Sequence, residues 1–152
     1  MKRAGWIVAG ALVIGTLDAA YAIIFWGMRG VAPIRIFQSI AAGLLGRAAF
    51  SGGLRTEALG LALHYFIALG IVVVYWIASR YLPLLTQRPI LCGAIYGVLV
   101  YLFMNYVVIP LSATSRSRFL LSWVVCSVIV HAFLIGAPAA LFASAAQKKS
   151  GG

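Results

Sequence analysis

The sequence predicts an all-α integral membrane protein: a four-helix bundle with one additional interfacial or re-entrant amphipathic helix. Of its 152 residues, 64% are hydrophobic and only 9% are charged, whereas a soluble domain of this length needs far more charge to cover its surface. Four apolar stretches are each long enough to cross about 30 Å of hydrocarbon as a helix. They are continuous rather than alternating in polarity, which argues against a transmembrane β-barrel.

The spanning helices are expected at about residues 6–28, 58–79, 90–112 and 119–146, so that residues 1–152 form a single transmembrane domain. The first stretch has an alternative interpretation as a secretory signal, because a basic end precedes an apolar core and Ala20-Tyr21-Ala22 is similar to a cleavage site. Its apolar run continues to Met28, which favours a spanning helix. Pro110 is expected to end or bend the third helix, and Pro138 to bend the fourth.

The long first connection contains the additional helix, predicted at residues 33–50. Pro33 suits a first helical position, and Gly52-Gly53 suit a stop. Apolar residues would share one side of this helix: Ile34, Phe37, Ile40, Ala41, Leu44, Leu45 and Ala48. The opposite side would carry Arg35, Ser39, Gly43, Gly46 and Arg47, with Arg35 and Arg47 contacting lipid at the interface. The alternative is a short helix that simply packs against the bundle.

The basic residues all lie in predicted tails and loops, although the formal net charge is +10. There they would anchor helix ends and meet anionic headgroups, so the partner is the lipid bilayer and not nucleic acid. The two faces carry equal numbers. One has Lys2, Arg3, Arg80, Arg88, Lys148 and Lys149; the other has Arg29, Arg35, Arg47, Arg55, Arg116 and Arg118. The basic N-terminus favours a cytoplasmic location for both termini.

A polar side chain lies inside each predicted span. At 1.5 Å per residue, Asp18 would lie ~15 Å from the face that bears the first loop, His64 ~10 Å, Asn105 ~10 Å and His131 ~18 Å. An ionised side chain at the bilayer centre costs about 2.5–3.5 kcal/mol on insertion scales, so Asp18 needs a partner. His131 has the closest predicted depth, and Tyr21 and Tyr101 could donate further hydrogen bonds.

Several functions remain open for this cluster. The four polar side chains could simply join the helices, or they could bind a proton or a small solute. An alternative is a small proton-coupled transporter or channel, which at this size would need to form a homodimer to enclose a path. A further alternative is an electron-transfer subunit that binds haem between His64 and His131. The sequence has no hydrolase or zinc-protease motif and no metal-ligand spacing, so a non-enzymatic protein without a cofactor is expected.

Two segments, "LHYFIALGIVVVYWIASRYLP" and "CGAIYGVLVYLFMNYVVIPLSA", carry a resemblance that extends over about residues 58–145. Its features are His64, Pro83, the pair Gly93 and Gly97, Pro110-Leu111 and a histidine in the fourth helix, His131. This pattern resembles the YagU-like inner-membrane proteins, an uncharacterised group with four helices. Some relatives are expected to have a histidine where this chain has Asn105. The resemblance implies a bacterial inner-membrane, multi-pass protein and no particular activity.

Overall fold

The computed structural model describes residues 2–114 and 120–148, and within these ranges every regular element is helical. The predicted all-helical class is therefore confirmed. Four helices are long and apolar enough to cross a membrane. They are α1 (Arg3–Gly27), α3 (Gly53–Tyr81), a third long helix (Pro89–Leu111) and a fourth (Leu121–Gln147).

The third and fourth long helices are each divided by a turn of π-helix. The third consists of α5 (Pro89–Phe103), the π-turn η2 (Met104–Val108) and α6 (Ile109–Leu111). The fourth consists of α7 (Leu121–Val130), the π-turn η3 (His131–Gly136) and α8 (Ala137–Lys148).

The two prolines that were expected to disturb these helices each lie two residues after the end of a π-turn. Pro110 is in α6, which ends one residue later, and Pro138 is in the first turn of α8. A proline has no N–H, and its ring collides with the carbonyl four residues earlier in an ideal α-helix. A wider turn upstream relieves that contact, because a π-turn moves the hydrogen-bond partner by one residue.

One helix boundary differs from the prediction in a way that matters for the site. The sequence predicts Gly52-Gly53 as a stop and the second span from about residue 58. In the structure the chain turns at Gly53, where φ is 58°, and α3 begins there. At the fourth long helix, the predicted first residue, 119, lies outside the described residues, as do Arg116, Arg118 and Lys149.

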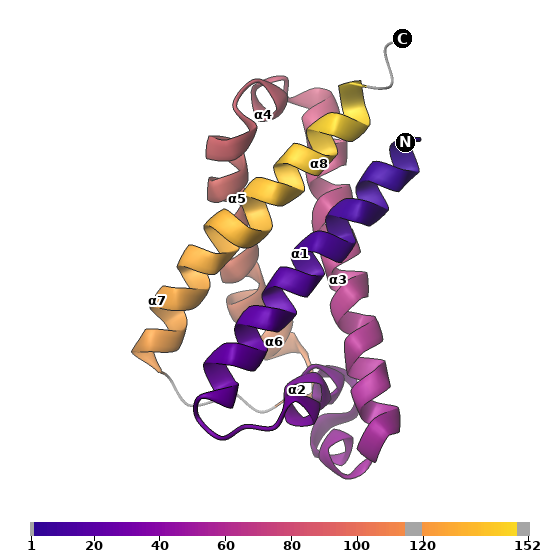
Figure 1. Cartoon of the computed structure of the whole chain (residues 1–152), viewed down its shortest axis with the longest axis vertical. Helices are drawn as coiled ribbons and strands as arrows, with labels where there is room; N and C mark the ends of the chain where they lie inside the picture. The colour runs from indigo at the N-terminus through magenta and orange to yellow at the C-terminus, as the bar shows by residue number, and fades with distance from the viewer. Residues whose placement is uncertain (1, 115–119, 149–152) are drawn as a thin grey trace.

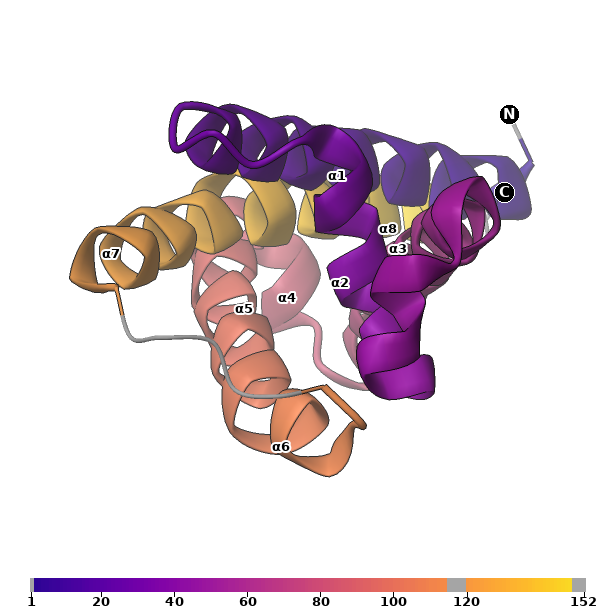
Figure 2. The same ribbon diagram turned by 90° about the horizontal axis from the view of Figure 1, so that it is seen from below.

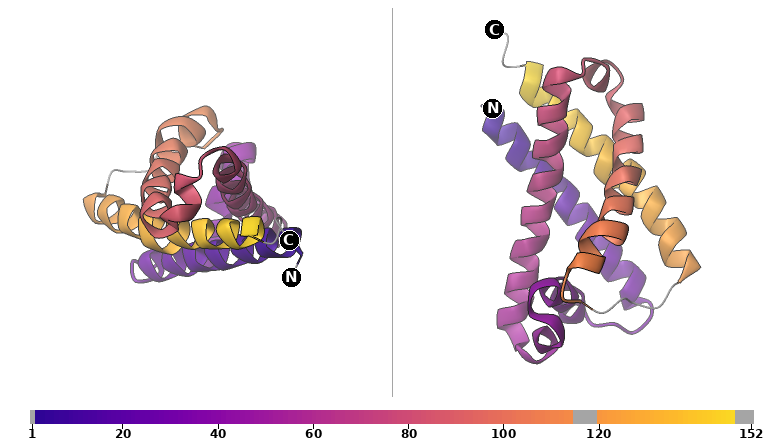
Figure 3. Two further views of the ribbon diagram at one scale, coloured as in Figure 1. Left: turned by 90° about the horizontal axis from the view of Figure 1, so that it is seen from above. Right: turned by 180° about the vertical axis from the view of Figure 1, so that it is seen from behind.

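The long helices form a bundle with both termini at one end (Figure 1). The short α4 (Leu84–Gln87), between α3 and α5, lies at that same end. Helices α1 and α8 run side by side, and α3 packs against both (Figure 3). Helix α5 packs against η3 and α8. The opposite end of the bundle carries α2, the end of α1 and the start of α7, and we call it the α2 end.

Helix α2 (Pro33–Leu45) lies across the α2 end rather than along the bundle (Figures 1 and 2). The predicted single helix over residues 33–50 is divided, because Gly46 adopts a φ of 59° and the chain continues as a 3₁₀ turn, η1 (Gly46–Ser51). The buried side of α2 consists of Ile36, Phe37, Gln38, Ala41 and Ala42. Much of its apolar surface therefore packs on α3, while Leu44 and Leu45 remain exposed.

The half of the bundle nearer the termini buries Ser79 and Ser144 close to the ends of α3 and α8. Deeper inside lies a cluster of buried apolar side chains, which we call the terminus-side core. It consists of Ile7, Ala11, Ile14, Ala68, Val72, Ile135, Ala139 and Ala146. Large apolar side chains also cover the outside of the long helices, among them Leu12, Phe66, Ile95 and Phe133. Such an outer surface suits hydrocarbon rather than water.

Candidate functional site

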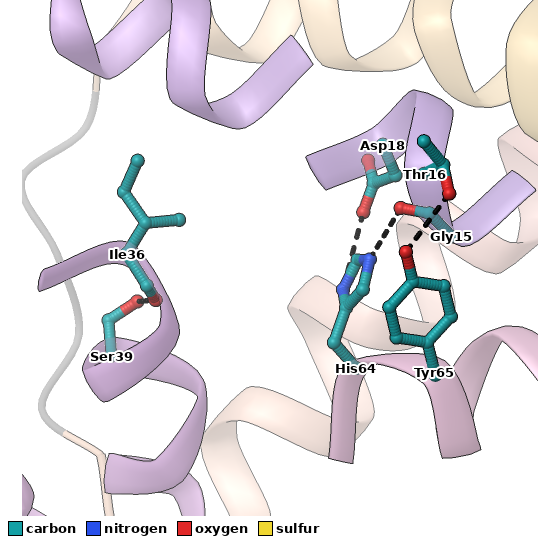
Figure 4. Close-up of polar contacts among 7 residues, drawn as sticks. All are labelled: Gly15, Thr16, Asp18, Ile36, Ser39, His64 and Tyr65. Carbon is teal, nitrogen blue, oxygen red and sulfur yellow. Dashed lines mark hydrogen bonds and ion pairs between the residues drawn. The ribbon is translucent and has the colours of Figure 1, made fainter. Parts of the chain in front are cut away.

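The Asp18 carboxylate and the His64 imidazole face each other between α1 and α3 (Figure 4). His64 Nδ1 lies 4.0 Å from Asp18 Oδ2, which is an ion-pair distance and too long for a hydrogen bond. The other ring nitrogen, Nε2, lies 2.7 Å from the Gly15 carbonyl oxygen. A carbonyl oxygen can only accept, so Nε2 carries the hydrogen. The side chains remain 31% exposed at Asp18 and 11% exposed at His64.

The close approach of α1 and α3 explains why this pairing forms. A Cβ at Gly15 would lie 2.8 Å from the Tyr65 ring, so a larger residue would push the helices apart. The Tyr65 hydroxyl is 2.9 Å from the Thr16 hydroxyl and ties the helices together beside the pair (Figure 4).

The partner of Asp18 is His64 rather than the predicted His131. Asp18 lies nine residues before the end of α1, about 13.5 Å from the α2 end at 1.5 Å per residue. Because α3 begins at Gly53, His64 lies eleven residues along it, about 16.5 Å, and not the ~10 Å that the predicted boundary gives. The corrected depth brings His64 to within about 3 Å of Asp18, a level that His131 also shares, so the close crossing of α1 and α3 at Gly15 decides the pairing.

His131 is the first residue of η3, and its Nδ1 lies 2.8 Å from the carbonyl oxygen of Ser127 in the same helix. Its ring meets the Tyr101 ring edge-on, with centroids 5.3 Å apart. The Ser127 hydroxyl is buried and lies 3.0 Å from the Tyr21 hydroxyl, which joins the fourth long helix to α1.

Asn105, in η2, also bonds within its own helix. Its Nδ2 donates to the Tyr101 carbonyl oxygen at 2.9 Å. Within residues 2–114 and 120–148, no hydrogen bond joins Asn105 to Asp18 or to either histidine. Asn105 and His131 thus share one arrangement: each side chain contacts the carbonyl four residues earlier, at a π-turn. Side-chain bonds of this kind bend helices.

A second polar group, which the sequence analysis missed, holds α2 against the start of α3. Gln38 is only 2% exposed, and its Nε2 donates to the Gly53 carbonyl at 3.2 Å and to the Thr56 hydroxyl at 3.3 Å. Thr56 in turn donates to the Ala49 carbonyl at 2.7 Å. We call Gln38, Thr56 and these two carbonyls the Gln38 knot. The sequence signal for this group was the amide of Gln38, which lies next to Phe37 on the apolar side of the predicted helix.

The two arginines predicted to contact lipid differ in their surroundings. Arg35 Nη1 donates to the Phe50 carbonyl at 2.9 Å and lies 3.4 Å from Gln38 Oε1, so its guanidinium joins α2 to η1. Arg47 is exposed. Arg47 is therefore the better placed of the two to meet a headgroup.

The described residues contain no group of three or more His, Cys, Asp or Glu side chains that could hold a metal ion. A haem iron needs a ring nitrogen that is not already engaged. In His64 both nitrogens have partners, since Nε2 donates to Gly15 and Nδ1 faces Asp18. His131 uses only Nδ1, on Ser127. The contacts of His64 therefore disfavour the haem alternative, which needs both rings.

Comparison with known proteins finds no matching family model, no similar curated protein and no similar solved structure. The resemblance to the YagU-like proteins accordingly stays a prediction. The function has to be argued from the geometry of the site.

Proposed function

We propose that this is a multi-pass membrane protein whose Asp18–His64 pair takes up and releases a proton inside the bilayer. The observation that carries the proposal is the orientation of the His64 ring. Because Nε2 donates to the Gly15 carbonyl, a neutral His64 would direct the lone pair of Nδ1 at the carboxylate 4.0 Å away. Two electron-rich groups face each other stably only if the pair holds a proton.

The same proton accounts for a carboxylate within the hydrocarbon. An isolated ionised aspartate would be costly there, whereas an imidazolium–carboxylate pair or an imidazole–carboxylic acid pair carries no net charge. Asp18 retains 31% of its side-chain exposure, so the pair is not sealed on all sides. Intramembrane ionisable residues that reach a polar path commonly mark proton sites.

The test of this proposal is an infrared pH titration of the full chain in lipid nanodiscs. The wild type should show a protonated carboxyl band together with changes in the imidazole bands as the pH is varied. Asp18→Asn should lose the carboxyl band, and His64→Gln should move its titration midpoint. Glu57→Gln is the matched control, because it removes the other acidic side chain of the sequence and should leave the Asp18 band in place.

An absent carboxyl band over the whole pH range in which the protein stays folded would refute proton binding and leave the pair as a link between helices. A transport role is a separate question, to be measured as pH-dependent flux in proteoliposomes. If flux occurs in the parent and is lost in a folded Asp18→Asn variant, the pair belongs to a transport path, for which a homodimer is expected. Titration without flux would assign proton binding alone.

The proposal includes an orientation in the bilayer. We infer a bacterial inner-membrane protein with both termini in the cytoplasm and α2 at the opposite surface. The position of α2 across the end of the bundle, with Leu44 and Leu45 exposed near Arg47, supports an interfacial helix. Single cysteines introduced at Ser51 and Thr86 should label from opposite sides. Spin labels at Leu44 and Arg47 should differ in exposure to lipid-soluble and water-soluble relaxing agents.

A further inference from the structure

We propose that the Asp18–His64 pair exchanges its proton with water only through the α2 end of the bundle, and that the Phe37 side chain is the barrier on that route. This inference rests on the proposed proton binding and adds the direction and control of access. It is carried by three features: the terminus-side core, the contact between Phe37 and His64, and the anchoring of Phe37.

The route towards the termini is long and apolar. Asp18 lies fifteen residues from the start of α1, about 22 Å, compared with about 13.5 Å to the other end of the same helix. The terminus-side core, whose side chains are buried and apolar, lies on the longer route. The buried polar groups of this half, Ser79 and Ser144, lie beyond that core, within the last two turns of α3 and α8. A Cβ at Gly10 would lie 2.8 Å from Phe142 and 3.3 Å from Val72, so the helices there are in tight contact.

On the shorter route, Phe37 of α2 lies directly against His64. The two rings meet edge-on with their centroids 6.3 Å apart. Gly60 makes this possible, because a Cβ at that position would collide with the Phe37 carbonyl oxygen. Helix α2 therefore lies on the backbone of α3 one turn before His64, and an apolar ring stands between the imidazole and the membrane surface.

Polar groups are present at the α2 end beyond Phe37. Glu57 is half-buried and lies seven residues before His64, which places it on the same side of α3 about two turns nearer the surface. Ser39 of α2 lies across from the pair in Figure 4. Other titratable side chains on the helices around the pair include Tyr21, Tyr65, Tyr101, Cys126 and His131.

The barrier is the ring itself rather than a helix that swings away. The Gln38 knot holds the residue next to Phe37 to the first turn of α3, and Arg35 joins α2 to η1. With the backbone fixed on both sides, opening requires motion of the Phe37 side chain, and replacing the ring by a methyl group leaves the backbone contacts in place.

The test measures access by thiol labelling in vesicles of defined orientation. In a background with Cys92→Ala and Cys126→Ala, His64→Cys should react with a membrane-impermeant thiol reagent added at the α2 end and not with reagent added at the terminus side. Phe37→Ala should raise the rate by about tenfold or more, which corresponds to about 1.4 kcal/mol in the free energy of opening. Ile36→Ala is the matched control, because Ile36 is a buried α2 neighbour that makes no ring contact with His64, and it should leave the rate unchanged.

Reaction from the terminus side, or equal rates with and without the Phe37 ring, would overturn the inference. If His64→Cys does not fold, exchange of the Asp18 carboxyl proton for deuterium in the otherwise native chain gives the same comparison, and Phe37→Ala should accelerate it. Labelling reports access and not protonation. One-sided labelling without an Asp18 titration would therefore refute proton binding alone, whereas a titration with two-sided labelling would refute the access route alone.

Discussion

The regions around His64 and His131 contain the same kind of side chain at nearly the same depth, yet they are built differently. His64 lies eleven residues into α3 and His131 ten residues into the fourth long helix, about 16.5 and 15 Å from the α2 end. His64 bonds to a carbonyl of another helix and faces a carboxylate. His131 bonds within its own helix.

The difference shows that the position of a histidine along its helix determines whether it lies in the polar half of the bundle. The backbone next to the histidine determines what its ring contacts. Beside His64, Gly15 lets α1 come close enough to offer a carbonyl. Beside His131, the backbone of α5 lies against the His131 carbonyl at Gly97, and the ring turns to Ser127. One region is a link between helices, and the other is a local feature of a π-turn.

The largest expected effect comes from the glycines at the two crossings. A Cβ at Gly97 would collide with the His131 carbonyl, and a Cβ at Gly60 with that of Phe37. Since backbone atoms cannot rotate away, Gly97→Val and Gly60→Val should each lower the free energy of unfolding by about 3 kcal/mol or more. Circular dichroism of unfolding in mixed detergent micelles measures this loss.

The two glycine variants should also differ in which helices they displace. Gly97→Val should separate two long helices, whereas Gly60→Val should mainly displace α2 and leave the His64–Gly15 bond. Gly70→Ala is the control, because nothing lies within 4 Å of a Cβ there, and it should stabilise α3 by about 0.5–1 kcal/mol. Full stability in both valine variants would contradict the close crossings.

An intermediate effect is expected for removal of a whole imidazole. His64→Leu should cost about 1–2 kcal/mol, because the bond to Gly15 is lost and Asp18 loses its partner. His131→Leu should cost less, since that bond lies within one helix. The double variant Asp18→Leu with His64→Leu should recover part of the loss, and a cycle of the four proteins measures the coupling. Additive losses would mean that Asp18 and His64 do not interact.

The smallest effect is expected for substitutions that keep hydrogen-bonding capacity. Asp18→Asn and His131→Gln should each fold with a loss below about 1 kcal/mol, because Asp18 meets His64 at 4.0 Å without a hydrogen bond, the His131 bond lies within one helix, and polar contacts in membranes contribute only about 0.6 kcal/mol on average. The two variants should differ only in the infrared titration, where Asp18→Asn alone removes the carboxyl band. A large loss of stability in Asp18→Asn would contradict this expectation and mean that the ion pair with His64 contributes strongly to holding α1 to α3.

The four long helices could be predicted because apolar runs of spanning length have few other solutions in lipid. The presence of polar groups in one half of the bundle could be predicted from the same helices by counting residues. The partner of Asp18 could not, because both histidines lie near its depth and the choice between them depends on how closely α1 approaches α3 at Gly15. The depth of His64 was also underestimated, because a glycine pair can end one helix or begin the next, and the sequence does not distinguish these roles at Gly53.

The contacts and the length of α2 could not be predicted from the sequence either. The length of α2 was overestimated because the spacing of Gly46 fits the polar side of a helix, whereas the Gly46 backbone leaves the helix. Gln38 lies among apolar neighbours, and the two oxygens that its Nε2 contacts come from residues 15 and 18 positions further along the chain. Local patterns do not report such pairings. Pro110 and Pro138 indicate that the third and fourth long helices are distorted nearby. They do not indicate that the distortion is a π-turn.

The π-turn η3 has a consequence for how the fourth long helix can change. An α-helix advances by about 100° per residue, and a π-turn holds one more residue than the turn it replaces. The side-chain register before His131 is therefore offset from the register after Gly136, and the buried Ser127 and Ala143 belong to different registers. Deleting one residue within η3 would remove the extra residue and leave a continuous α-helix, so the alanines of α8 would still face the core, whereas a deletion elsewhere in α7 or α8 would rotate the later side chains by about 100° and turn Leu141 inward. Tolerance to insertion and deletion in this segment should follow the π-turn rather than the loops.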